Sequence, residues 1–134
     1  MELTRRDALA AAVAPLLLAI TGKAQAMQNT PVFVHDLPNL TMDDWQVTVS
    51  QLTMFPGNVG SPHRHPGFVL VYVLEGEVVA KITGSPEATY GPGQMFYEFP
   101  GSTHEVSRNA SKTKPAKFLA FIFAKKGLPL TSPA

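Results

Sequence analysis

Residues 57–76 read GNVGSPHRHPGFVLVYVLEG, and this stretch indicates both a β-rich fold and a metal site. His63 and His65 stand two residues apart beside strand-like sequence. A strand repeats every two residues, so both imidazoles can project from one face. Two neutral imidazoles side by side make a good partial site for a divalent metal. The alternative is a pair of polar histidines at a loop edge, because HxH alone is a common pattern.

Strand-like segments separated by turn residues run through most of the chain. The apolar run from Val69 to Val79 is broken at Glu75-Gly76, which predicts a strand, a tight turn and a return strand. Phe118–Phe123 is apolar on both faces, as is typical of a central strand. The other predicted strands cover 31–35, 45–49 with a bulge or bend at 50–51, 94–99 and 104–108. With 12 prolines and 10 glycines, the chain is predicted to be an all-β sandwich or barrel.

The first 26 residues have the organisation of an export signal. The charged Thr4–Asp7 precedes 13 mostly apolar residues, and Ala24-Gln25-Ala26 predicts cleavage after Ala26. The apolar part is interrupted by Pro15 and falls short of the ~20 residues that span a bilayer, so no stable membrane anchor is predicted. Arg5-Arg6 resembles a twin-arginine export signal, although Ala8 stands where phenylalanine is usual. We therefore expect a cleaved twin-arginine signal peptide at 1–26 and a periplasmic or secreted protein.

Length and composition limit the fold and the partners that residues 27–134 can have. This length suits a single domain, with an extended C-terminal tail from Lys125. The whole chain has 11 Lys+Arg and 10 Asp+Glu, and the signal segment holds three and two of these, which leaves eight of each sign. A nucleic-acid-binding domain would carry a basic surplus, so no nucleic-acid partner is expected. With no cysteine in the chain, disulfides and thiolate metal sites are excluded.

A second stretch, Gly93–His104, completes a resemblance to the cupin family. The first cupin motif, G(x)5HxH(x)3–4E(x)6G, is matched at Gly57, His63, His65 and Gly76, but its glutamate position is Val69. The second motif, G(x)5PxG(x)2H(x)3N, is matched at three positions, Gly93, Gly101 and His104. Its proline is displaced to Pro100, and Asn109 falls one residue late. The resemblance covers roughly residues 47–123.

The resemblance implies a cupin double-stranded β-helix, a jelly-roll-like antiparallel barrel, with a metal near its mouth. By position, His63, His65 and His104 would be the metal ligands. Valine cannot ligate, so the site either works with three histidines or takes Glu98 as a replacement. A solvated carboxylate at a strand end is the alternative interpretation of Glu98. Glu105 is expected to point away from the site, because it neighbours His104 on a strand.

Three functions are compatible with this pattern. The protein is expected to be a metal-dependent enzyme for a small polar organic substrate, of oxygenase, isomerase or lyase type. A non-catalytic metal- or ligand-binding module is the alternative, and a metal-free scaffold is disfavoured by the three matched histidines. The metal is one divalent transition ion, with Mn, Fe, Co, Ni, Cu and Zn all open. A homodimer is expected, because symmetric dimers are the commonest soluble oligomers.

Overall fold

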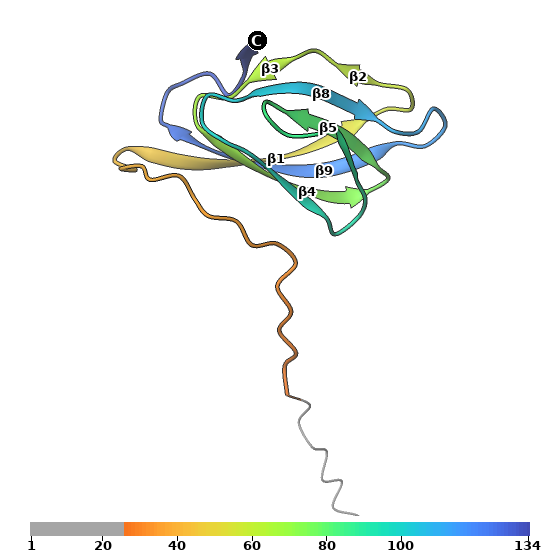
Figure 1. Ribbon diagram of the computed structural model, residues 1–134, viewed down its shortest axis with the longest axis horizontal. Helices are drawn as coiled ribbons and strands as arrows, with labels where there is room; N and C mark the ends of the chain where they lie inside the picture. The colour runs from red at the N-terminus through yellow and green to blue at the C-terminus, as the bar shows by residue number, and fades with distance from the viewer. Residues whose placement is uncertain (1–25) are drawn as a thin grey trace, which may run out of the picture.

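The computed structural model describes residues 26–134, and every regular element in that range is a β-strand (Figure 1). None of the described residues forms a helix long and apolar enough to cross a membrane. Of the predicted signal peptide, residues 1–25 lie outside the described part of the chain. The strands form two antiparallel sheets that face each other, and the all-β prediction is confirmed.

The first sheet has four strands in the order β1-β9-β4-β7. They are β1 (Trp45–Met54), β9 (Ala116–Lys125), β4 (Phe68–Glu75) and β7 (Met95–Glu98). β9 lies between β1 and β4, as its apolar sequence predicts. Its residues from Ala116 to Ala124 alternate between buried and half-buried, so one face looks into the core.

The second sheet has the order β10-β3-β8-β5-β6, with β2 also paired to β8. Its long strands are β8 (Thr103–Asn109) and β5 (Val78–Ile82), and the short ones are β2 (Val59–Gly60), β3 (His63–Arg64), β6 (Ala88–Tyr90) and β10 (Ser132–Pro133). β10 closes one edge of this sheet by pairing with β3, so the C-terminus lies beside β3 (Figure 1). The predicted extended tail therefore ends as an added strand.

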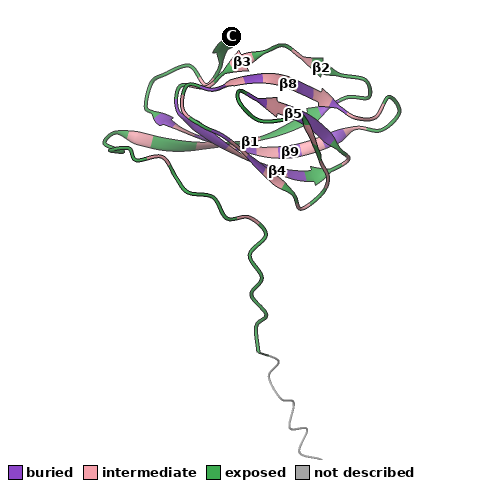
Figure 2. Ribbon diagram, in the orientation of Figure 1, coloured by how far each residue is buried: buried purple, intermediate pink, exposed green. Residues whose placement is uncertain are grey.

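The core fills the space between the sheets with residues that alternate along each strand. Val69, Val71 and Val73 of β4 are at most 2% exposed, and Val78 and Ala80 of β5 face them from the other sheet. Figure 2 shows the buried positions along β4, β5, β8 and β9, whereas the segment before β1 is exposed. Each valine buried in this way contributes about 1.5–3 kcal/mol of transfer free energy.

Three details differ from the sequence prediction. The turn at Gly76 forms, with a φ of 71°, but β4 and β5 lie in different sheets instead of pairing as a hairpin. β1 runs unbroken from Trp45 to Met54 in continuous register with β9, so the bulge at 50–51 is absent. Residues 31–35 form no strand, because no neighbouring described strand pairs with them. Instead the ring of His35 packs against Tyr97, with ring centroids 4.2 Å apart.

Candidate metal centre

His63 and His104 face each other across the β3–β8 ladder, where they are direct register partners. Their ring centroids lie 4.9 Å apart. The ring of His65, just after β3, meets His63 edge to face at 5.0 Å. The two stretches that carry the motif histidines are therefore brought together by strand pairing between segments about 40 residues apart in the chain.

Glu98 reaches the histidines from the opposite sheet. It is the last residue of β7, and its inward neighbour along that strand is Phe96. A tight turn follows, in which the Ser102 N–H donates to the Phe99 carbonyl and Gly101 has a φ of 77°. This turn crosses from the four-stranded sheet to β8. It therefore sets the Glu98 carboxylate 3.2 Å from Nδ1 of His104.

Glu98 is only 4% exposed, and the ion pairs of its carboxylate within the described residues are with two imidazoles. Its second oxygen lies 3.5 Å from Nε2 of His65. Within residues 26–134 no lysine or arginine forms an ion pair with it. A buried carboxylate is costly unless positive charge is close, so a cation among these groups would balance it. The interpretation of Glu98 as a solvated carboxylate is wrong.

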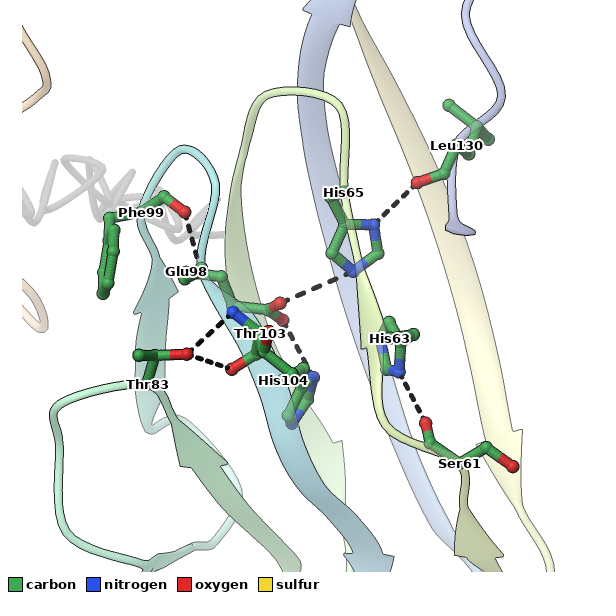
Figure 3. A network of polar contacts seen from close by, with 10 residues as sticks. Ser61, His63, His65, Thr83, Glu98, Phe99, Thr103, His104 and Leu130 are labelled. Carbon is green, nitrogen blue, oxygen red and sulfur yellow. Dashed lines mark hydrogen bonds and ion pairs between the residues drawn. The ribbon is translucent and has the colours of Figure 1, made fainter. Parts of the chain in front are cut away.

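Backbone carbonyls fix the orientation of two histidines (Figure 3). Nδ1 of His63 lies 2.9 Å from the Ser61 carbonyl, and Nδ1 of His65 lies 2.7 Å from the Leu130 carbonyl. A carbonyl oxygen only accepts hydrogen bonds, so each Nδ1 carries the proton and each Nε2 keeps its lone pair. Such support of the far ring nitrogen is the usual arrangement around metal-binding histidines.

Within residues 26–134, one ring nitrogen of His104 has no hydrogen-bond partner. Its Nδ1 faces the Glu98 carboxylate, and its Nε2 is buried without any hydrogen-bond partner among the described residues. Buried polar atoms are nearly always paired, and an imidazole nitrogen with a free lone pair is a metal donor. This orphaned nitrogen is the direct structural sign that the residues fit a cation.

Burial affects the protonation of His63. Loss of solvent is the largest influence and lowers the pKa of His63 below its ordinary value of 6.5, and the nearby rings of His104 and His65 act in the same direction. The hydrogen bond to Ser61 and the charge of Glu98 oppose this shift. The net direction favours the neutral ring at pH 7, which is the form that binds metals.

Ligand atoms of His63, Glu98 and His104 all lie within 4.8 Å of one another, an arrangement able to hold a metal ion. His65 is outside this group of three, but its Nε2 points at Glu98 from the adjacent position. Imidazole and carboxylate donors suit the transition metals from Mn to Zn. Glu105 pairs with Lys81 on the outside, as its position next to the buried His104 along β8 predicts.

The cluster forms one wall of a cavity of about 360 Å³ between the sheets. Apolar side chains line most of it, namely Val69, Val71, Phe96, Phe118, Ala120 and Ile122. Of the large apolar residues near the second motif only Phe96 lines this cavity. Met95 and Tyr97 lie on the other face of β7, and Phe99 is 41% exposed. Leu130 and Thr131 of the tail complete the wall beside the histidines.

Sequence reasoning missed the part played by the C-terminal tail. The contact between His65 and Leu130 joins residues 65 positions apart through a backbone carbonyl, which every residue type carries. No residue pattern could have identified it. Asn109 was noted only as a displaced motif residue. Its side-chain amide donates to the carbonyls of Met54, Phe55 and Lys114, so it anchors the loops beyond the site.

Residues 50–122 match the cupin domain family model, which is more than half of the chain, and the protein belongs to the cupin family. The fold is the cupin double-stranded β-helix, as predicted. No curated protein matches the chain.

Solved structures share this fold. The DMSP lyase DddQ from Ruegeria pomeroyi is 21% identical over 69% of this chain and 44% of its own, with a TM-score of 0.58. A predicted oxalate decarboxylase from Thermotoga maritima is 26% identical over 57% of this chain and 64% of its own, with a TM-score of 0.51. An uncharacterized conserved protein with a double-stranded beta-helix domain from Klebsiella pneumoniae is 17% identical over 81% of this chain and 98% of its own, with a TM-score of 0.56. The chain thus spans less than half the length of the DMSP lyase, 44%, and these likenesses concern the fold.

Proposed function

We propose that this cupin binds one divalent transition metal through His63, His65, His104 and Glu98 and acts as an enzyme on a small organic molecule. The observation that carries the proposal is the grouping of His63, His104 and the buried Glu98, whose ligand atoms lie within 4.8 Å of one another, while Nε2 of His104 has no partner among the described residues. On a six-coordinate metal ion, three imidazoles and one carboxylate would leave two coordination positions for a substrate. The reaction classes in view are oxygenase, isomerase and lyase.

A bound metal would act at this site as a Lewis acid toward a substrate oxygen or as a centre for O2. The chain itself supplies the surroundings. The carbonyls of Ser61 and Leu130 hold two imidazoles in one tautomer, and the apolar cavity wall excludes water from the ligand. Oε1 of Glu98 lies 3.2 Å from Nδ1 of His104 and so orients this ring. Two structural neighbours are named as a DMSP lyase and a predicted oxalate decarboxylase, and this favours the lyase class.

Metal content measures the first part of the proposal. Elemental analysis of protein made in its native host should give about one transition metal per chain. His63→Ala combined with His104→Ala should abolish it, and His35→Ala is the matched control, because His35 lies away from the cluster against Tyr97. Unchanged stoichiometry in the double variant would overturn the site.

The non-catalytic module is the alternative function. Metal-loaded protein should be screened for O2 consumption and for turnover of small oxygen-containing acids and ketones. Turnover lost in the double variant supports an enzyme. Tight binding of a ligand without turnover supports the module instead.

The location follows from the predicted signal peptide. Export in folded form through the twin-arginine pathway would let the protein acquire its metal in the cytoplasm. Arg5→Lys combined with Arg6→Lys should retain the protein in the cytoplasm, and cell fractionation measures this. Periplasmic recovery of that variant would contradict the proposal.

The homodimer is supported by the edge of the four-stranded sheet. β1 has β9 as its one strand partner among the described residues, and its Val47 and Val49 are 50% and 51% exposed. An open edge with apolar side chains is a surface that a second copy can cover. Light scattering should give the dimer mass, whereas a monomer mass across a range of concentrations would contradict it.

A further inference from the structure

The cavity beside the histidines has a polar end and an apolar body. The polar end holds His63, His65, Glu98 and His104. Away from it, β4 and β9 contribute Val71, Phe118 and Ala120, and β5 contributes Val78 from the opposite sheet. The polar residues that line this part are uncharged, namely Ser50, Thr53, Asn58 and Ser107. A volume of about 360 Å³ lies at the lower end of the range for small-molecule sites, about 300–1,000 Å³. The space therefore suits a small ligand with a single polar head.

Among the described residues, no lysine or arginine of the cavity could pair with a second negative charge on that ligand. Within residues 26–134, neither lysine nor arginine lines the cavity. Arg64 stands between the two site histidines in sequence but is exposed, and its Nε donates to Oγ1 of Thr103 outside. Three basic side chains of the neighbouring strands β8, β5 and β9 form ion pairs on the outer surface, namely Arg108–Glu87, Lys81–Glu105 and Lys117–Glu75.

From this distribution we infer that the pocket selects ligands with one metal-binding oxygen head and an uncharged, apolar body. It discriminates against dicarboxylates whose second carboxylate lies beyond the head group. That carboxylate would lose its water among mostly apolar and otherwise uncharged side chains, without a cation to replace it. The inference rests on the proposed metal site, because the head group needs the metal as its partner.

A matched pair of ligands tests the inference on the full mature protein loaded with Co²⁺. The pair is 2-oxoglutarate and 5-methyl-2-oxohexanoate, which share the 2-oxo acid head. They differ in a terminal carboxylate against an isopropyl group of similar shape. Isothermal titration should show at least 10-fold tighter binding of 5-methyl-2-oxohexanoate, with a change in the Co²⁺ absorption spectrum. Equal or tighter binding of 2-oxoglutarate overturns the inference.

A cation placed in the cavity should shift the preference. Leu52 lines the cavity and is 40% exposed, so Leu52→Lys introduces a positive charge without emptying the core. The ratio of the two affinities should move at least 10-fold toward 2-oxoglutarate. Leu74→Lys is the matched control, because Leu74 is also 40% exposed and does not line the cavity. An unchanged ratio in a folded Leu52→Lys protein overturns the inference, and Ser50→Lys replaces that variant if it fails to fold.

Metal analysis of the same samples separates the two levels of the argument. If Co²⁺ is absent at about one per chain, the proposed metal site fails, and the inference fails with it. If Co²⁺ is bound and neither acid binds, the metal site stands and the ligand class is wrong.

Discussion

Glu98 lies directly opposite Val69 in the antiparallel ladder between β7 and β4. Val69 occupies the position where the first cupin motif has its glutamate, and both side chains face the cavity. The Cβ atoms of such partners are about 4.5–5.5 Å apart, so a carboxylate on either strand can reach the same cluster. The carboxylate missing from β4 is thus present on the neighbouring strand, within 3.2 Å of His104.

Removing the charge of Glu98 should weaken metal binding. Glu98→Gln keeps the shape of the side chain, but it removes the anion that faces His65 and His104. We expect the metal affinity to fall about 10- to 100-fold, the range for lost supporting groups at metal sites. Competition with a chelator of known affinity measures it. Glu105→Gln is the control, because Glu105 pairs with Lys81 on the outside, and an equal loss in both variants would contradict the role of Glu98.

Moving the carboxylate back to β4 should restore what Glu98→Gln loses. Val69→Glu alone places a second buried carboxylate opposite Glu98, and like charges at this range repel, so the single variant should lose stability. The double variant Val69→Glu/Glu98→Val should be more stable than Val69→Glu alone and should bind metal more tightly than Glu98→Gln. Thermal unfolding and metal titration measure the two effects. A double variant that binds metal no better than Glu98→Gln would contradict this prediction, because the carboxylate would then have to come from β7.

The C-terminal tail should contribute to metal affinity through the Leu130 carbonyl. Deleting residues 128–134 removes the acceptor 2.7 Å from Nδ1 of His65, so the ring loses its fixed tautomer. We expect about 10- to 100-fold weaker metal binding with the barrel intact. The control deletes only 132–134, which removes β10 but keeps Leu130. Equal losses in the two deletions would assign the effect to β10 pairing instead.

Asn109 should contribute to stability and not to metal binding directly. Asn109→Ala leaves the carbonyls of Met54, Phe55 and Lys114 without their donor. Unsatisfied buried groups cost about 1–3 kcal/mol each, and solvent can reach some of these acceptors, so we expect a loss of roughly 2–4 kcal/mol. Urea unfolding of metal-free protein measures it, with the exposed Asn39→Ala as the control. A loss below about 1 kcal/mol would contradict this anchoring role.

Gly67 should not tolerate a side chain. A Cβ at this position, between the His65 loop and β4, would lie 1.8 Å from the Phe123 carbonyl oxygen of β9. Backbone in a central strand cannot yield by that amount, so Gly67→Ala should cost at least about 3 kcal/mol, among the larger single-residue effects. Gly91→Ala is the control, because its nearest neighbour is the flexible Gln94 side chain at 3.8 Å. Comparable melting temperatures for the two variants would contradict this packing argument.

Local sequence patterns predict the class of fold and the three histidines that meet at the site, and they leave Glu98 open between a ligand and a solvated carboxylate. Alternating apolar positions, the HxH pair and His104 after a Pro-Gly turn are local patterns, and strand geometry makes them readable without a structure. The central place of Phe118–Phe123 followed from the same argument, because a strand apolar on both faces needs neighbours on each side.

Which strands are neighbours, and therefore what surrounds the histidines, is known from the folded chain and not from local sequence. β4 and β5 follow each other along the chain but enter opposite sheets, and Val69 meets Glu98 through a pairing 29 residues away. Residues 31–35 look like a strand yet form none, because a strand needs a partner that local sequence does not specify. The Leu130 carbonyl that orients His65 is a backbone group common to all residues, so only the folded chain could bring it to the site.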